Sequence, residues 1–400
     1  MCKKYFKSDN SFSSRISRLC WFLLAVIMRL FVKVVKGRIV CWSFNGMQYS
    51  CNPRYISQYL LDKNLDNGEL YWVLSEQAGH EGLNSRINVV RPHTINYIYV
   101  LYSSEFVITN CRTSRFVDFF IKKKGQKYIM TWHGPIPLKK IEKDAEDKLP
   151  GMYIKNAKRD SKMCDLMLSN SRFYTDIIKS AFYYDGEILE KGMPRNDIFF
   201  EENTKKTLRN HLLGKLNVPE ETTIILYAPT FRSNDKSDIY RIDWQAILDE
   251  YRKKTARKAC IFLRLHPNSL GVIDIDSLVN GEDVYNLCFY PDMQELLLVS
   301  DILITDYSST MFEMCLQQKP CFLYTPDLDY YDRGFYFDLA SLPFPLSRTE
   351  EELKHEILNF RNEVYQLKID KFNKEYLANY DDGHACQALY DWMKNKSLEK

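Results

Sequence analysis

The sequence has 400 residues, 45% hydrophobic and 27% charged, which is long enough for two folded domains and too apolar for a disordered chain. Its 55 basic and 52 acidic side chains leave a formal net charge of +3, which argues against a dedicated nucleic-acid-binding protein. The eleven cysteines form no C-x-x-C pair and no zinc-finger spacing, so we expect free thiols in a reducing compartment.

Residues 1–37 differ in composition from the rest of the chain. The charged residues of this segment are almost all basic, and Asp9 is the only acid before Arg38. The apolar run from Leu19 to Val35 is interrupted by Arg29 and Lys33, whereas a membrane span needs about 20 mostly apolar residues. No small-residue cleavage site of a secretory signal follows. We expect a helix that lies on an anionic membrane surface; a single span and a helix packed on the protein itself are the alternatives.

On such a helix, one set of side chains would enter the lipid and another would reach the headgroups. The apolar set is Trp21, Phe22, Leu23, Ile27, Leu30 and Phe31, and the basic set is Arg15, Arg18, Arg29, Lys33 and Lys36.

From residue 38 to about residue 200, short apolar strands alternate with helix-length segments. The expected strands are R-I-V-C-W-S-F (38–44), E-L-Y-W-V-L (69–74), R-I-N-V-V (86–90), E-F-V-I-T-N (105–110), K-Y-I-M-T-W (127–132) and D-L-M-L-S-N (165–170). Helices are expected at 53–61 and 94–103. This alternation predicts a parallel sheet covered on both faces, a Rossmann-like domain over 38–200.

A second series of the same kind predicts a Rossmann-like domain over 201–400, with helices at its C-terminal end. Its strands are expected in T-I-I-L-Y-A-P-T (223–230), A-C-I-F-L-R-L-H-P (259–267), D-I-L-I-T-D (301–306) and P-C-F-L-Y (320–324), with a helix at 243–255. A linker at 196–219 contains a polar helix. The fold class is therefore α/β with two domains.

Ligands of parallel sheets bind beyond the carboxyl ends of the strands, and polar motifs collect at those points. His133 follows a strand in T-W-H-G, where Gly134 allows close approach of the backbone to a ligand. His266 follows another in R-L-H-P, two residues after Arg264, so that the two side chains share one side of the chain. An imidazole beside a cation suits a phosphate group. The alternative is structural, with Arg264 paired to a carboxylate and His266 capping a turn.

A third motif, I-T-D-Y-S-S-T-M-F-E, places Ser308, Ser309 and Thr310 before a helix. Helix N-termini bind phosphate, and Glu313, one turn later, is placed to accept hydrogen bonds from ribose; an ordinary N-cap is the alternative. Arg195 and Arg232 are further candidates, and a surface ion pair is the alternative for each. The sequence has no tight cluster of carboxylates and histidines, so we expect neither a required metal nor a cofactor.

Taken together, these motifs resemble the CDP-glycerol glycerophosphotransferase family, which includes teichoic acid primases, polymerases and related capsule polymer enzymes. The matching pieces run from about residue 128 to the end: T-W-H-G-P-I-P-L-K-K, K-G-M-P-R-N-D, L-Y-A-P-T-F-R, R-L-H-P, I-T-D-Y-S-S-T-M-F-E, R-G-F-Y-F-D and D-D-G-H-A. The resemblance implies a GT-B fold, with two Rossmann-like domains that face a cleft. It also implies transfer of a polyol phosphate, glycerol phosphate or ribitol phosphate, from a CDP-polyol to a lipid-linked glycan acceptor of the undecaprenyl type, with release of CMP.

Carried onto this sequence, the resemblance makes His133 the base that deprotonates the acceptor hydroxyl, and His266 the group that stabilises or protonates the leaving phosphate. The implied donor contacts are Trp132, Gly134, Pro135, Ile136, Arg195, Pro229, Thr230, Arg264, Leu265, Ser308, Ser309 and Glu313. Two positions depart from the common family pattern. The loop H-G-P-I-P-L-K-K is one residue longer than H-G-T-P-L-K-K, and Glu313 stands where Asp is common.

The resemblance places the protein at the cytoplasmic face of the cell membrane, as a peripheral or monotopic protein, with homo-oligomers possible and no nucleic-acid partner. A GT-B glycosyltransferase that uses a nucleotide sugar is one alternative. An inactive membrane-bound scaffold of the same fold is another, against which the presence of both histidines argues.

Overall fold

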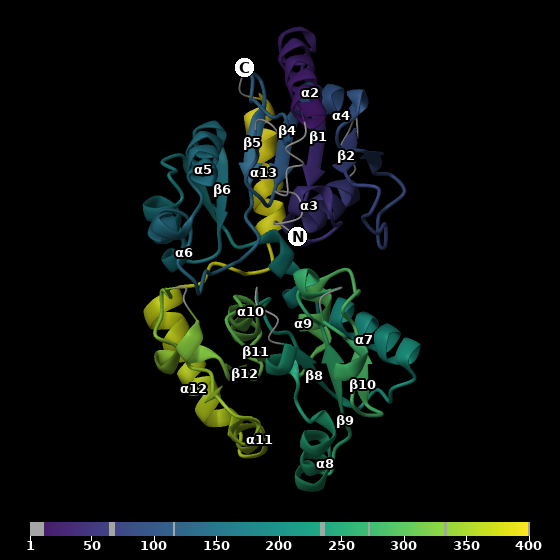
Figure 1. Cartoon of the computed structure of the whole chain (residues 1–400), viewed down its shortest axis with the longest axis vertical. Helices are drawn as coiled ribbons and strands as arrows, with labels where there is room; N and C mark the ends of the chain where they lie inside the picture. Colours follow the sequence, from purple (N-terminus) through teal and green to yellow (C-terminus); the bar gives the residue numbers. More distant parts are fainter. Residues whose placement is uncertain are drawn as a thin grey trace. The chain divides into compact units, whose positions relative to one another are not determined.

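The computed structural model describes residues 12–63, 69–114, 117–232, 237–270, 273–331 and 334–398. These residues form two compact units (Figure 1). The unit that we call N-terminal comprises Cys2–Pro135, Ile141–Asp197 and Asn379–Lys400, as far as they are described. The C-terminal unit comprises Ile136–Lys140 and Ile198–Ala378.

The N-terminal unit is built on a parallel sheet of seven strands in the order β3-β2-β1-β4-β5-β6-β7. They are β1 (Val35–Trp42), β2 (Leu70–Val73), β3 (Asn88–Val90), β4 (Ser104–Thr109), β5 (Lys127–Met130), β6 (Leu166–Ser169) and β7 (Glu187–Glu190). In β1, Val40 pairs with Tyr71 on one side and with Val107 on the other. The strand order reverses at β1, and in such sheets ligands bind beyond the carboxyl ends of the strands next to this reversal.

Helices cover this sheet because its central strands β4, β5 and β6 are apolar and buried along most of their length. They are α2 (Phe12–Phe31), α3 (Cys51–Asp62), α4 (Ile95–Ser103), α5 (Gly151–Met163), α6 (Arg172–Ala181) and α13 (Ala385–Leu398). Side-chain caps fix two of the starts: Thr94 accepts from the N–H of Tyr97, and Ser171 accepts from that of Tyr174.

The C-terminal unit contains a six-stranded parallel sheet in the order β10-β9-β8-β11-β12-β13. Its strands are β8 (Thr223–Tyr227), β9 (Ala259–Leu263), β10 (Val284–Asn286), β11 (Ile302–Thr305), β12 (Cys321–Tyr324) and β13 (Leu346–Ser347). Numbered within the unit, the order is 3-2-1-4-5-6, that of a dinucleotide-binding Rossmann sheet. The predicted α/β class with parallel sheets is confirmed.

The helices of the C-terminal unit are α7 (Glu202–Leu216), α8 (Trp244–Thr255), α9 (Met293–Val299), α10 (Thr310–Leu316), α11 (Glu350–Leu358) and α12 (Asn362–Phe372). Thr349 and Glu352 form a complete capping box at the start of α11. Strands β8 and β9 are buried along their whole length, which explains why their continuous apolar runs predicted them well.

Helix α13 returns from the end of the chain to the N-terminal unit. Leu389, Trp392 and Met393 join the same hydrophobic core as Ile39 and Trp72, and Figure 1 shows α13, in yellow, against the N-terminal sheet. Residues 379–398 therefore do not group with the rest of the domain expected over 201–400. The physical reason is the apolar face of α13, which is buried on the first sheet.

Helix α2 packs on the N-terminal unit with one face and exposes the other. Trp21 lies 6.4 Å from Phe119 between ring centroids, and the guanidinium of Arg29 donates to the backbone carbonyls of Ile121 and Lys122. Trp21 and Arg29 therefore face the protein rather than lipid and headgroups. Among the described residues, no helix has the length and apolar character that a membrane span requires.

Candidate functional site

His133 lies three residues beyond the end of β5, in a backbone turn of unusual conformation. Trp132 has φ = 56°, a left-handed value that residues with a Cβ rarely adopt. The indole of Trp132 stacks on the imidazole at 4.5 Å between centroids, and Phe44 lies 5.8 Å from it. His133 is nevertheless exposed, so its ring contacts two aromatic side chains and is still accessible to a ligand.

The hydrogen bond on one ring nitrogen sets the tautomer of His133. Nδ1 lies 3.0 Å from the carbonyl oxygen of Asn110, at the end of β4. A carbonyl only accepts, so Nδ1 carries the proton, and the neutral ring has its lone pair on Nε2. Among the described residues, Nε2 has no hydrogen-bond partner. This is the arrangement of a general base.

The charge state of His133 favours the same role. Desolvation by the surrounding protein lowers the pKa of His133 below the ordinary imidazole value, and the positive charge of Arg195 lowers it further. The hydrogen bond to Asn110 acts in the opposite direction but is outweighed. The imidazole is therefore neutral, and able to take a proton, at neutral pH.

The residues near His133 that were predicted to contact the donor differ in burial and in the unit to which they belong. Arg195 is 6% exposed and donates from Nη1 to the carbonyl oxygen of His133, at 2.8 Å. Pro135 is buried and Gly134 half-buried. Ile136 is 1% exposed and belongs to the C-terminal unit. Contacts of these residues with a donor remain predictions.

The lengthened loop after His133 joins the C-terminal unit through its backbone. Lys140 donates its N–H to the carbonyl of Gly334 at 2.8 Å, and Tyr336 donates to the carbonyl of Leu138 at 2.9 Å. The H-G-P-I-P-L-K-K and R-G-F-Y-F-D motifs, almost 200 residues apart, are thus in contact.

His266, in the C-terminal unit, has the opposite tautomer. Its Nδ1 accepts a hydrogen bond from the backbone N–H of Asn268 at 3.1 Å, as the cap of the short turn Pro267–Ser269. The neutral ring must therefore carry its proton on Nε2. The turn cap that formed part of the structural alternative is present. It leaves the imidazole as an N–H donor, a form that is also suited to a phosphate oxygen.

Arg264 supplies positive charge two residues before His266. It donates from Nη1 to the carbonyls of Leu265 and Cys288. Among the residues that the structure describes, no carboxylate lies within ion-pair distance of Arg264. Burial lowers its pKa. Arg264 is half-buried, and the charge of the buried Asp292 acts in the opposite direction on its pKa. A guanidinium without a direct ion pair is a suitable place for an anionic ligand.

Arg232, by contrast, is neutralised by two carboxylates. Its guanidinium lies 2.8 Å from Asp306 Oδ2 and 2.7 Å from Asp327 Oδ2, and Asp306 also accepts from the N–H of Thr230. Burial alone would lower the pKa of Arg232, but the two acids raise it instead. Arg232 therefore joins the loop after β8 to the loops after β11 and β12, beside the buried Pro229.

The S-S-T motif forms the start of α10, as predicted. Ser308 Oγ accepts from the backbone N–H of Thr310 at 3.3 Å, and Ser308 and Ser309 are half-buried. Glu313 is 1% exposed, and its Oε1 accepts from Gln294 at 2.9 Å. Leu265 is also buried, at 1% exposure. The ribose contact expected of Glu313 stays a prediction.

Two asparagines near His133 escaped the sequence analysis. Asn110 supplies the carbonyl that orients the ring, and its Oδ1 accepts from the N–H of Phe44 at 2.8 Å. Asn52, at the start of α3, donates to the carbonyl of Trp132 at 3.1 Å. Asn110 ends the run E-F-V-I-T-N, so its position after a strand was a usable signal. Asn52 had only its place at a helix start.

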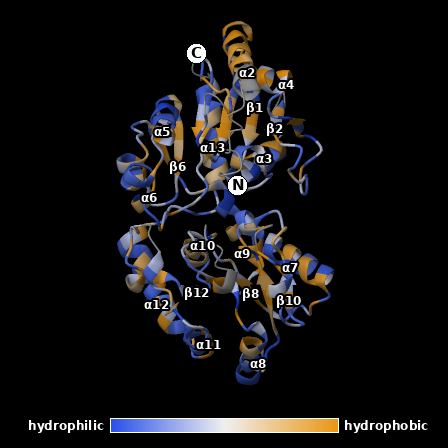
Figure 2. Cartoon of the chain, viewed as in Figure 1, coloured by the Kyte–Doolittle hydropathy of each residue, from blue (hydrophilic) through white to orange (hydrophobic). Residues whose placement is uncertain are grey.

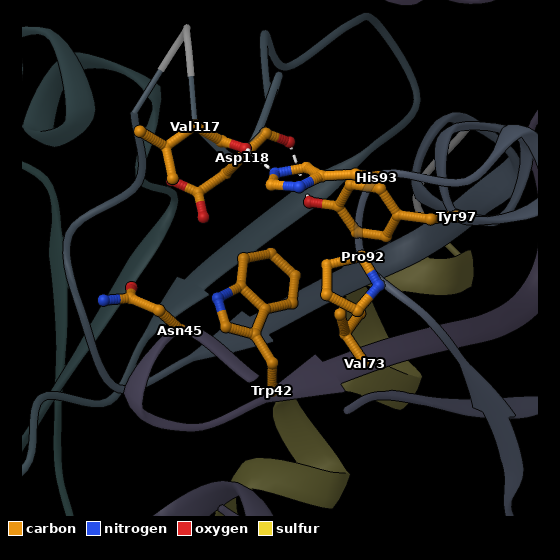
Figure 3. Close-up of a pocket in the computed structure, with 8 residues that line it drawn as sticks. All are labelled: Trp42, Asn45, Val73, Pro92, His93, Tyr97, Val117 and Asp118. Carbon is orange, nitrogen blue, oxygen red and sulfur yellow. Dashed lines mark hydrogen bonds between the residues drawn. The ribbon is translucent and has the colours of Figure 1, made fainter. Parts of the chain in front are cut away.

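A separate small cavity lies beyond the ends of β1 and β2 (Figure 3). It is lined by Trp42, Asn45, Val73, Pro92, His93, Tyr97, Val117 and Asp118. Burial raises the pKa of Asp118 to about 7, and the Tyr97 hydroxyl donates to the Asp118 carbonyl at 2.7 Å. Its volume of about 20 Å³ accommodates one water and no polyol. In the described part of the chain, no group of three or more His, Cys, Asp or Glu has the arrangement of a metal site.

Each of the two α/β units has a histidine beyond the end of a strand of its parallel sheet, with a ring nitrogen held by a backbone group. The family model described as CDP-Glycerol:Poly(glycerophosphate) glycerophosphotransferase matches residues 24–395, and the chain belongs to this family. The predicted family membership is confirmed.

Relatives and solved structures agree with this assignment. The chain is 33% identical over 377 residues to a teichoic acid poly(glycerol phosphate) polymerase of Staphylococcus epidermidis, covering 90% of this chain and 51% of the relative. It is 30% identical to the teichoic acid glycerol-phosphate transferase of Staphylococcus aureus, covering 88% and 92%. A structure of the wall teichoic acid polymerase TagF superposes with a TM-score of 0.80 at 30% identity, covering 94% of each chain.

The lengths differ among these relatives. The chain spans about half of the S. epidermidis polymerase and 45% of the poly(glycerol phosphate) polymerase of Bacillus subtilis.

Proposed function

We propose that the protein transfers a polyol phosphate from a CDP-polyol to a hydroxyl of a lipid-linked acceptor, with release of CMP, in the synthesis of a teichoic acid or capsular polymer. Glycerol phosphate is the first candidate, since relatives named for glycerol phosphate match at 30 to 33% identity. Ribitol phosphate is the second candidate, since two ribitol-phosphate relatives of Bacillus spizizenii match less well: a poly(ribitol-phosphate) polymerase at 30% but over only 56% of this chain, and a ribitol-phosphate primase at 26% over 75%.

The observation that carries the proposal is the pair of opposite tautomers. In the proposed reaction, His133 Nε2 takes the proton of the acceptor hydroxyl. The acceptor oxygen then bonds to the phosphorus that carries the polyol, and the bond from this phosphorus to the CMP oxygen breaks. His266 Nε2–H donates to the CMP phosphate as its negative charge develops. Arg264 adds a positive charge on the side of His266, as phosphoryl transfer requires.

The proposal includes a GT-B arrangement in which the two units face a cleft, so that His133 and His266 act on one donor. The similarity to TagF over nearly the whole chain supports this. The donor contacts predicted in the C-terminal unit, at Pro229, Thr230, Leu265, Ser308, Ser309 and Glu313, follow β8, β9 and β11, where a Rossmann sheet binds nucleotides.

The proposed location is the inner surface of the membrane, with α2 as the contact. Apolar side chains of this helix are exposed: Leu23 is 52% exposed and Phe31 79%. The neighbouring α4 also exposes apolar side chains, Ile95 at 63% and Tyr99 at 42%. Figure 2 shows hydrophobic residues, in orange, on both helices. An apolar patch of this kind at the end of a basic segment is suited to an anionic lipid surface.

The direct test is to incubate the protein with a lipid-linked acceptor and, in turn, with CDP-glycerol, CDP-ribitol and UDP-sugars. CMP released from a CDP-polyol, together with phosphate-linked product, supports the proposal. UDP released from a sugar donor would establish the glycosyltransferase alternative. No release from any donor, by a protein whose TagF-like fold is verified, would favour the inactive scaffold.

A further inference from the structure

Two buried side chains of the N-terminal unit, Asn52 and Arg195, donate hydrogen bonds to the backbone carbonyls of the turn that carries His133. Asn52 Nδ2 lies 3.1 Å from the carbonyl oxygen of Trp132 and 3.5 Å from that of Thr131. Arg195 Nη1 donates to the carbonyl of His133 at 2.8 Å. Because Trp132 is in the left-handed region, this backbone needs outside contacts to keep its conformation.

The two side chains also hold each other. The Oδ1 atom of Asn52 accepts from the backbone N–H of Arg195 at 3.0 Å, and Arg195 Nη1 reaches the sulfur of Cys51 at 3.4 Å. Asn52 is 0% exposed and Arg195 6%. One buried amide thus joins the start of α3, the turn that carries His133 and the loop after β7.

We infer that Asn52 and Arg195 are positioning residues, which fix the strained turn so that His133 Nε2 is held toward the acceptor hydroxyl. The inference deepens the proposed function and rests on the role of His133 as the base. Neither residue needs to touch a substrate for this role. For Asn52, which has no exposed surface, the interior contacts are the only ones that the structure provides.

Arg195 has a second effect, through its charge. The positive charge of Arg195 lowers the pKa of His133. The other described side chains that contact the ring or its hydrogen-bond partner, Phe44, Trp132 and Asn110, carry no charge. A cation at this place disfavours the imidazolium and keeps His133 in the form that accepts a proton.

The competing role for Arg195 is direct contact with the donor, as the family resemblance implies. The two roles differ in their kinetics. Replacing a residue that binds the donor raises the KM for the CDP-polyol, whereas displacing the base lowers kcat and leaves KM nearly unchanged. A base misplaced by about 1 Å costs on the order of 100-fold in rate.

The kinetic test compares Asn52→Ala, Arg195→Lys and Arg195→Met with Ser57→Ala. Ser57 is a matched control, because it is 0% exposed on the same helix and its hydroxyl donates to the carbonyl of Arg54, away from the His133 turn. We expect kcat to fall about 10- to 100-fold in the three variants with KM within about 2-fold of wild type, and the control to retain wild-type kinetics.

A second test does not depend on activity. The full-length protein is labelled with ¹³C-histidine for NMR, and the His133 resonance is identified as the one that is missing from the spectrum of His133→Gln. Arg195→Met should move the titration midpoint of His133 to higher pH, whereas Arg195→Lys should keep it. Asn52→Ala should shift the His133 resonance and leave the other histidines in place. If Asn52→Ala does not fold, Asn52→Ser takes its place in both measurements.

An unchanged His133 resonance and unchanged kcat in the Asn52 and Arg195 variants would overturn the inference. A raised KM with unchanged kcat in Arg195→Met would overturn it for Arg195 in favour of donor contact. A wild-type protein that releases no CMP from any CDP-polyol would instead refute the proposed function, and the His133 resonance would still report whether the turn is held as inferred.

Discussion

His133 Nδ1 donates to the carbonyl oxygen of Asn110 at 3.0 Å, and this one bond leaves the opposite nitrogen of the ring as an acceptor. The bond is to the backbone, so no substitution of Asn110 removes the carbonyl itself. The function of the ring is therefore best probed at His133.

The variant His133→Gln should lose about 100- to 10,000-fold in kcat, the usual contribution of a well-placed general base. Gln is close in size and keeps a polar side chain, but it cannot take a proton at neutral pH. CMP release from a CDP-polyol is the measurement. His80→Gln is the control, since His80 is exposed and contacts Arg91 instead. Equal activity of the two variants would exclude His133 as the base.

The lowered pKa of His133 sets the direction of the pH dependence. Desolvation and Arg195 disfavour the imidazolium, so the ring stays neutral to lower pH than free imidazole. The acid limb of kcat/KM should therefore lie below about pH 6.5, the ordinary histidine value. A rate profile from pH 5 to pH 9 checks this. An acid limb above pH 7 would mean that the site stabilises the imidazolium, which would contradict the effects of desolvation and of the Arg195 charge.

The sequence predicted those parts of the fold that long apolar runs encode, and it missed those that depend on distant partners. Strands β8 and β9 were predictable because every residue is buried. Strand β7, E-I-L-E, lies at a sheet edge with both ends exposed, so it has no apolar run. The return of α13 depends on contacts such as Trp392 Nε1 to Glu187, which lie 205 residues apart.

The same division holds for the site. Histidines beyond strand ends follow from the topology of a parallel sheet, and both were predicted. The tautomers were not, because each depends on a backbone group, the carbonyl of Asn110 or the N–H of Asn268. The contact from Asn52 to Trp132 spans 80 residues and leaves no local signal.

Asp381, in the D-D-G-H-A motif, should make the stability of the N-terminal unit pH-dependent. Burial raises its pKa to about 7, although the N–H of Met193 and the amides of Asn170 and Asn196 donate to it. A carboxyl whose pKa is higher when folded stabilises the fold below its unfolded value of about 4 and loses this stabilisation as pH rises to about 7. The slope is at most about 1.4 kcal/mol per pH unit.

The variant Asp381→Asn should remove this share of the pH dependence. Asn170 and Asn196 each have an amide oxygen with no partner among the described residues, so both can rotate to accept from a new amide. Urea unfolding at pH 5 and pH 8, followed by tryptophan fluorescence, checks the prediction. If the free energy of unfolding changes equally between pH 5 and pH 8 in the wild type and in the variant, Asp381 is already ionised at pH 5.

The double ion pair of Arg232 should be essential for the stability of the C-terminal unit. Replacing Arg232 with Met leaves Asp306 and Asp327 in a buried site without their cation, which should cost about 3 to 5 kcal/mol. Arg257→Met, at an exposed position, should change stability by less than about 0.5 kcal/mol. Chemical denaturation of both variants is the measurement, and equal effects would show that the buried pair is not stabilising.

The apolar face of α2 should determine binding to lipid. Ile27→Glu and Leu30→Glu place charge on side chains that are 53% and 66% exposed, so the fold should tolerate them while insertion into the acyl boundary becomes unfavourable. Co-sedimentation with vesicles of mixed neutral and anionic lipid should show much weaker binding. Leu367→Glu, on α12 of the C-terminal unit and 72% exposed, is the matched control and should bind as wild type does. If the control loses binding and the α2 variants do not, the lipid-binding surface lies on the other unit and α2 is a structural helix.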